Sequence, residues 1–266
     1  MRPPLRTSVL LAAALATVVV ACIDLNTGVD SASLQFRGVP APSVVVGDTL
    51  RDSLGLAVPL TATVTGGRKL RFLPLDTSIR IDSNGYLTAR SRDTSASATN
   101  IVRVIADAGG TLQTPPQALV VTVRPDQLVS HGGAVPALAY IADAAGTGAD
   151  TGNRSAELQV RLRHLYTPGE AGAVARDTIV RTFVVRFDII SSAGAIADSA
   201  LLVSDLGNPT RSDTTNASGV ASRRIRLYPK TTATANDSVV VLARVAYRGS
   251  NIPGSPLRIV LPLRKR

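Results

Sequence analysis

The clearest pattern in the chain is the alternation of apolar and polar residues that begins near residue 34. Residues 60–65 read Leu-Thr-Ala-Thr-Val-Thr, and residues 158–163 read Leu-Gln-Val-Arg-Leu-Arg. A period of two places every second side chain on the same face, which is typical of a strand with one buried face. Further runs of this kind lie at 79–81, 86–89, 101–106, 118–123, 178–190, 199–204, 220–227, 238–247 and 257–263. Since no segment has a convincing helical period, the pattern predicts an all-β protein built of β-sandwiches.

The N-terminus has a different pattern, with a basic start at Arg2 and Arg6, an apolar run over residues 9–21, and then Cys22. The run is about thirteen residues long, whereas a membrane-spanning helix needs about twenty. The tetrapeptide that ends in Cys22, Val-Val-Ala-Cys, resembles the lipobox of bacterial lipoproteins. An ordinary secretory signal followed by a chance cysteine, or an uncleaved anchor, would also fit the apolar run.

The lipobox resemblance implies that residues 1–21 are a signal peptide and that the Cys22 thiol accepts a diacylglycerol group. Acyl chains of the palmitate class would then hold the chain on the membrane, with residues 22–33 as a lipidated tether. Residue 23 is Ile rather than the Asp of the usual retention signal, which implies transfer to the outer membrane.

Residues 34–124 are expected to form the first sandwich. Their motifs Val46-Gly47-Asp48-Thr49-Leu50, residues 76–89 with the turn Asp82-Ser83-Asn84-Gly85, and the closing Val120-Val121-Thr122-Val123 resemble the bacterial Ig-like domain, group 2, over about 31–124. Phe72 stands where that family usually has Trp, and residues 51–59 are an insertion relative to the family pattern. The resemblance implies a scaffold without catalytic residues.

Residues 125–266 are expected to form a second, more basic Ig-like sandwich. The sequence Arg124-Pro125-Asp126 ends the first unit, and the stretch up to Asn153 reads either as a linker or as a strand at 137–141 followed by a long loop. Residues 215–222 are weakly similar to a step of the group 1 bacterial Ig-like domains, a likeness that covers about 128–265.

Composition narrows the chemistry further. The chain has 266 residues with 29 basic and 19 acidic side chains, two His and a single Cys. One cysteine and two distant histidines argue against disulfides, structural zinc and haem, and no cofactor is expected. The positive charge favours anionic partners, but no basic patch is interleaved with aromatic residues, so nucleic acid is not expected as a partner.

Candidate catalytic residues are few: Ser130-His131 on a loop, and His164, which we expect to be an exposed residue at a strand end. Neighbouring Ser and His cannot face each other as a catalytic pair requires, so we expect no enzyme and no catalytic site. Calcium is the more serious ligand, through loops that carry Asp143, Asp150, Asn153, Glu157, Asp205 and Asn208. Because Asp and Asn in loops are usually turn formers, no metal site is predicted.

The arginines of the second unit invite a binding hypothesis. Eight of them, most on polar strand positions, are Arg161, Arg163, Arg181, Arg186, Arg223, Arg224, Arg226 and Arg244. Four are the candidate ligand-binding residues: Arg161, Arg163, Arg224 and Arg226. If several share one sheet face, that face would attract phosphate or acidic glycan. The alternative is a solvated sheet surface whose charges discourage edge pairing.

Together these patterns predict a non-enzymatic outer-membrane lipoprotein, held by its N-terminal lipid and facing either the periplasm or the surface. Its two sandwiches would serve as a binding, adhesion or spacing module for an anionic glycan or an envelope protein. The alternative is a periplasm-facing structural or accessory subunit of an envelope complex.

Overall fold

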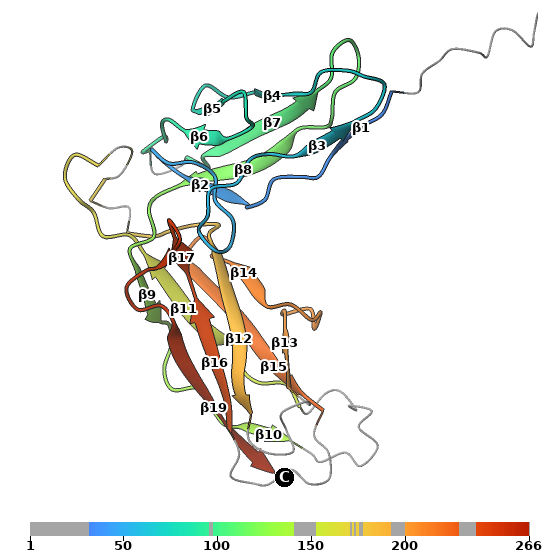
Figure 1. The fold of residues 1–266 in the computed structure, drawn as a ribbon. Coiled ribbons are helices and arrows are strands. Elements are labelled where there is room, and N and C mark those ends of the chain that lie inside the picture. Colours follow the sequence, from blue (N-terminus) through green and yellow to red (C-terminus); the bar gives the residue numbers. More distant parts are fainter. Residues whose placement is uncertain are drawn as a thin grey trace, which may run out of the picture.

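The computed structural model describes residues 32–95, 98–140, 153–170, 172, 174–175, 178–192, 200–228 and 238–265. These residues form strands, turns and loops, with no helix among them, and none of their segments is a helix able to span a membrane. The expected signal peptide, the lipid attachment residue Cys22 and most of the tether lie outside the described residues. Figure 1 shows two β-sandwiches that meet end to end.

The first sandwich contains a four-stranded sheet in the order β2-β8-β7-β4, in which β2 and β8 are parallel. Two strand pairs, β1 with β3 and β5 with β6, complete it. The strands are β1 (Leu34–Phe36), β2 (Ser43–Val45), β3 (Ala62–Val64), β4 (Arg71–Pro74), β5 (Ile79–Ile81), β6 (Leu87–Ala89), β7 (Ile101–Asp107) and β8 (Gln117–Thr122). Their inward side chains form one apolar core around Leu50 and Leu87. Phe72 packs against this core with the centroid of its ring 5.5 Å from that of Phe36.

The second sandwich packs a five-stranded sheet, β10-β19-β16-β12-β14, against a four-stranded sheet, β13-β15-β11-β9. Its strands are β9 (Gln127–Ser130), β10 (Leu138–Tyr140), β11 (Leu158–Arg163), β12 (Val184–Ser192), β13 (Ala200–Val203), β14 (Ser212–Thr214), β15 (Val220–Leu227), β16 (Ser238–Arg244) and β19 (Leu257–Lys265). A short hairpin, β17 (Ala246–Tyr247) with β18 (Ser250–Asn251), follows β16 and lies at the end that faces the first sandwich (Figure 1).

Alternation along β11 explains its place in the second core. Leu158, Val160 and Leu162 are fully buried, because they point between the two sheets, while the intervening polar residues face outward. The same sheet contains β9, in the stretch where the sequence favoured a linker or a single strand at 137–141. Leu128 of β9 is 1% exposed and lies opposite Leu162 of β11. Burial of this leucine holds β9 in the sheet, although the strand is too short for its alternation to be recognised in the sequence.

The tight turn before β6 depends on Gly85. Its φ is +84°, and a Cβ built there would lie 3.1 Å from the carbonyl oxygen of Leu60. The Asp82 side chain closes the turn by accepting hydrogen bonds from the backbone amides of Asn84 and Tyr86, each at 2.9 Å. The position therefore combines a left-handed backbone with a close approach to another segment.

We expect Gly85→Ala to lower the free energy of unfolding by about 2 kcal/mol. The positive φ is unfavourable for alanine, and the new Cβ would also lie too close to the Leu60 carbonyl oxygen. Gly47→Ala is the matched control, because Gly47 has φ +75° and no neighbouring atom within 4 Å of a built Cβ. Thermal unfolding followed by circular dichroism measures both variants. Equal losses of stability would contradict a role for the Leu60 contact.

Candidate functional site

The first candidate site is the junction between the two sandwiches, where one carboxylate is held by donors from both. Asp48 is 7% exposed and lies just after β2. Arg51 contacts both of its oxygens, from Nε at 2.9 Å and from Nη2 at 3.0 Å. From the second sandwich, the Tyr247 hydroxyl donates to Oδ2 at 2.6 Å and the Arg248 Nε donates to it at 3.2 Å. We call Asp48, Arg51, Tyr247 and Arg248 the junction cluster.

The insertion at residues 51–59 provides the backbone side of this contact. Its turn is closed by Asp52, whose Oδ1 accepts from the amides of Leu54 and Leu56, each at 2.9 Å. Gly55 then approaches the β17–β18 hairpin so closely that a Cβ would lie 3.0 Å from backbone atoms of Tyr247 and Gly249. The Gly249 amide donates to the Gly55 carbonyl at 3.1 Å. Residues 51–59 therefore form the loop that docks one sandwich on the other.

The junction cluster has strong electrostatic coupling. Burial alone would raise the pKa of Asp48, but the hydrogen bonds from Arg51, Tyr247, Thr49 and Arg248 hold it well below its usual range. Burial, together with the hydrogen bond to Asp48, raises the pKa of the Tyr247 phenol well above its usual value. The Asp48 carboxylate raises the pKa of Arg248 as well. The cluster therefore keeps one negative and two positive charges throughout the physiological pH range.

The connection between the sandwiches is held by a second polar group. Asp126 lies 2.8 Å from Nδ1 of His164 and 2.5 Å from Nε of Arg124, and Glu170 lies 3.6 Å from Nε2 of His164. His164 is 1% exposed, so the expectation that it is an exposed strand-end residue is wrong. Its Nδ1 also lies 3.0 Å from the Arg124 carbonyl, whereas its buried Nε2 has no hydrogen-bond partner among the described residues. An imidazole covered in this way fastens the connecting segment and is closed to a substrate.

The predicted arginine face is the second candidate site. Strands β11 and β15 are antiparallel neighbours, with Arg161 opposite Val220. Alternation puts Arg161, Arg163, Arg224 and Arg226 on the outer face of the same sheet, because Val160, Leu162, Ile225 and Leu227 are buried on the inner face. Arg223 points to the inner face instead, where it is 8% exposed and pairs with Asp213 of β14 at 3.1 Å. The structure thus brings the four candidate residues onto one face.

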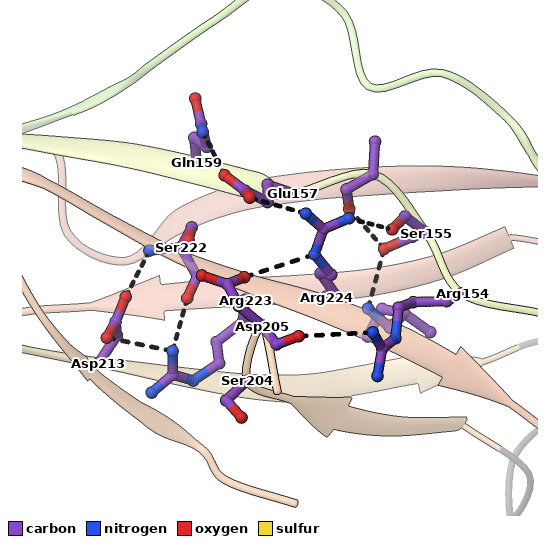
Figure 2. Close-up of polar contacts among 12 residues, drawn as sticks. Arg154, Ser155, Glu157, Gln159, Ser204, Asp205, Asp213, Ser222, Arg223 and Arg224 are labelled. Atoms are coloured by element: carbon purple, nitrogen blue, oxygen red, sulfur yellow. Dashed lines mark hydrogen bonds and ion pairs between the residues drawn. The ribbon is translucent and has the colours of Figure 1, made fainter. Parts of the chain in front are cut away.

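Acidic residues neutralise one end of this face, as Figure 2 shows. Arg224 donates to Glu157 at 2.7 Å and to the carbonyl of Ser155 at 3.2 Å, and lies 3.4 Å from Asp205. Arg226 lies over the ring of Tyr228, 5.3 Å from its centroid. The free positive charge therefore lies at the other end, where Arg161 donates to the Ser218 carbonyl at 3.1 Å and Arg163 is exposed.

The same contacts bear on the calcium hypothesis. Glu157 and Asp205, two of its candidate ligands, are ion-pair partners of Arg224. Asn153 is 4% exposed, and Asp143 and Asp150 lie outside the described residues. Within the part of the chain that the structure describes, no three His, Cys, Asp or Glu side chains are grouped so that they could hold a metal ion.

Sequence reasoning missed the junction cluster. Asp48 was visible only as a scaffold motif residue and Arg51 only as part of an insertion, while Tyr247 and Arg248 lie about 200 positions later. The available signal was the coincidence of an insertion with a Tyr-Arg-Gly turn in an otherwise regular strand pattern. Neither feature alone identifies the other as its partner.

Comparison with known proteins identifies no family for this chain. No protein-family model matches the chain, and no curated protein matches it. Among solved structures, the Yersinia pseudotuberculosis adhesin InvE is 14% identical over 87% of this chain, with a TM-score of 0.36, and the chain spans 58% of its length. The D00–D0 domain of intimin is 15% identical over 87% of this chain and 98% of its own, with a TM-score of 0.29. Human protocadherin-24 EC1–2 is 13% identical over 88% of this chain and 99% of its own, with a TM-score of 0.28.

The described strands therefore make the chain an all-β protein of two tandem β-sandwiches, as the alternating pattern predicted. Its finer assignment to the group 2 and group 1 bacterial Ig-like domains stays a prediction.

The junction cluster predicts how the two sandwiches respond to loss of one charge. We expect Asp48→Asn to lower the free energy of unfolding by about 2 kcal/mol. The Asn side chain has one acceptor oxygen, whereas the two arginines and Tyr247 donate to both oxygens of Asp48. It should also broaden the distance distribution between spin labels placed in the two sandwiches. Asp52→Asn is the matched control, since an Asn oxygen still accepts from the Leu54 and Leu56 amides. A narrow distribution in Asp48→Asn would contradict the role of the cluster.

The same contact predicts a pH dependence. The folded-state pKa of Asp48 lies below its unfolded value of about 3.9, so its stabilising contribution is complete above that pH and is lost as the pH falls toward the folded-state pKa. We therefore expect the narrow distance distribution of the unsubstituted protein to persist at pH 4. Broadening between pH 7 and pH 5 would show that another group controls the junction.

Proposed function

We propose that this protein is a non-enzymatic, lipid-anchored protein of the bacterial cell envelope that holds a binding domain away from a membrane. The observation that carries the proposal is the junction cluster, because a buried carboxylate with donors from both sandwiches joins them into one unit. A spacer must hold its free end at a defined distance and direction from its anchored end. Two domains that move freely relative to one another would not do so.

The positions of the two chain ends support this arrangement. Strand β1 begins at the end of the first sandwich that lies away from the junction, and the second sandwich extends from the other side of the junction (Figure 1). A lipid on Cys22 would therefore hold the first sandwich near the membrane and keep the second sandwich at a distance. Anchoring through the Cys22 lipid, and transfer to the outer membrane, are parts of this proposal.

The binding surface that we assign to the second sandwich is the free end of the arginine face. Arg161 and Arg163 lie two residues apart on the outward side of β11, and Arg163 is exposed. Guanidinium groups in such a row suit the carboxylates or phosphates of an anionic glycan, or an acidic patch on an envelope protein. Adhesion to one of these partners is the concrete form of the function.

A second candidate, a periplasm-facing structural subunit, is favoured by a different observation. The other end of the arginine face has mixed charge, and apolar side chains lie beside it on β13 and the following turn. Leu201 is 42% exposed and Leu206 is 86% exposed. Exposed leucines next to paired charges are typical of contacts with another protein subunit.

Mass spectrometry of the membrane-extracted protein tests the anchor. We expect Cys22 to be the N-terminal residue and to have a diacylglycerol group, while Cys22→Ser should release the protein from the membrane fraction. An unmodified Cys22 would overturn the anchor.

Protease treatment of intact cells distinguishes the two candidates. We expect a C-terminal tag to be lost from intact cells, which corresponds to a surface-facing binding domain. Protection of the tag until the outer membrane is permeabilised would favour the structural subunit.

Charge removal on β11 tests the binding surface. The double variant R161Q/R163Q should reduce adhesion to alginate, an acidic polysaccharide, by about tenfold or more. R258Q/R264Q is the matched control, since both of these arginines are exposed on β19 in the opposite sheet. A similar loss in both variants would mean that net charge, and not this face, governs adhesion.

A further inference from the structure

The first sandwich has a basic surface at the end that lies away from the junction. It is formed by the turn between β3 and β4, which contains Arg68 and Lys69, by Arg71 at the start of β4, and by the neighbouring turn after β7. These residues, with Ala108, Gly109 and Gly110, line an open groove of about 450 Å³. We call this surface the basic tip.

The geometry of the basic tip leaves its positive charges facing outward. Arg68 and Lys69 are exposed, and Arg68 is oriented by a hydrogen bond from Nη1 to the Gly109 carbonyl at 3.1 Å. Arg71 has 67% of its side chain exposed, although its Nε lies 2.6 Å from Asp107. Gly109 and Gly110 have no side chains, so a flat surface can approach the guanidinium groups closely.

Among the described residues of the basic tip, the one opposing charge is buried. Asp107 is the only acidic residue in segments 62–74 and 104–114, which form the basic tip. It is 2% exposed, and its Oδ1 accepts from the Gln113 side chain at 3.1 Å while its Oδ2 faces Arg71. The hydrogen bond from Arg71 holds the pKa of Asp107 below its usual range, so this carboxylate stays charged beneath the surface. Three cations therefore face solvent over one covered anion.

The chain enters the first sandwich at the same tip. The Ser33 amide donates to the Thr65 hydroxyl at 2.8 Å, and Ala32 lies against Gly66 in the turn that leads to Arg68. Ala32 lies ten positions after Cys22, which corresponds to at most about 35 Å of extended chain. The tip is thus the part of the first sandwich that an anchor at Cys22 would hold nearest to the membrane.

We propose that the basic tip docks on the phosphates of anionic lipid headgroups in the membrane that holds the protein's own N-terminus. This inference rests on the proposed lipid anchor, because the anchor keeps the tip close enough to the membrane to reach the layer of about 10 Å in which surface charges act. Docking adds a second attachment to the lipid, and two attachments orient a domain where a single tether leaves it free to rotate. The second sandwich would then be held in a defined direction.

Vesicle cosedimentation tests the tip independently of the anchor. The chain from Ile23, which contains all described strands but has no lipid, is mixed with vesicles of phosphatidylglycerol and phosphatidylcholine, or of phosphatidylcholine alone. We expect binding only to the anionic vesicles. R68Q/K69Q should lower the partition coefficient by about 10- to 30-fold, since each basic residue near an anionic surface contributes about 1 kcal/mol. Arg71 is left unchanged because it covers Asp107.

The matched control is R80Q/R90Q, which removes the same charge from exposed positions on β5 and directly after β6. Its partition coefficient should fall much less than that of R68Q/K69Q. Equal decreases in the two variants would overturn the proposal, because net charge alone would then explain the binding. Displacement by millimolar inorganic phosphate at constant ionic strength would assign the groove to a free anion and would also overturn it. Equal binding to both kinds of vesicle would do the same.

The two proposals fail separately. An unmodified Cys22 in the mass spectrum removes the anchor but leaves vesicle binding by the tip unchanged. Loss of selectivity between the vesicles removes the tip as a docking surface but leaves the lipid on Cys22 in place.

Discussion

The arrangement of this protein depends on a single buried carboxylate. Asp48 loses water on burial, and this cost is offset only because donors from both sandwiches surround it. Arg51 alone could not keep the two domains together, since it belongs to the same domain as Asp48. The Tyr247 hydroxyl and the Arg248 guanidinium, both from the second sandwich, make this a contact between the two domains. The position of one sandwich relative to the other follows from this contact.

The sequence predicted strands wherever one complete face is buried over several residues. Residues 220–227 are an example, since β15 has those bounds and buries Ala221, Ile225 and Leu227. Prediction failed at β2, β4, β9 and β14, where three or four residues are too few to establish a period. It also failed for His164, because its partners Asp126 and Glu170 become neighbours only when the chain folds back. Alternation predicted outward positions for the four arginines, but only the pairing of β11 with β15 brings them onto one face, and the partner of Arg224, Asp205, comes from a distant turn.

Residues 51–59 give the first sandwich a contact that its regular strands do not provide. The regular strands of the first sandwich follow the pattern of a common fold, and they specify little beyond that fold. The departure from the pattern supplies Arg51 and the close approach at Gly55, both of which contact the second sandwich directly or through Asp48. Local departures from a family pattern are often where function or assembly is encoded. In this protein, residues 51–59 determine how the two sandwiches are joined.

The lengths of the strands have a consequence for crowded surfaces. The edge strands β9, β10, β13 and β14 are three or four residues long, whereas the interior strands β12 and β16 have nine and seven. A short edge presents few unpaired amide and carbonyl groups to a neighbouring molecule, so it is a poor template for further strand addition. Many copies of this protein can therefore stand side by side at high density without their sheets merging into fibres.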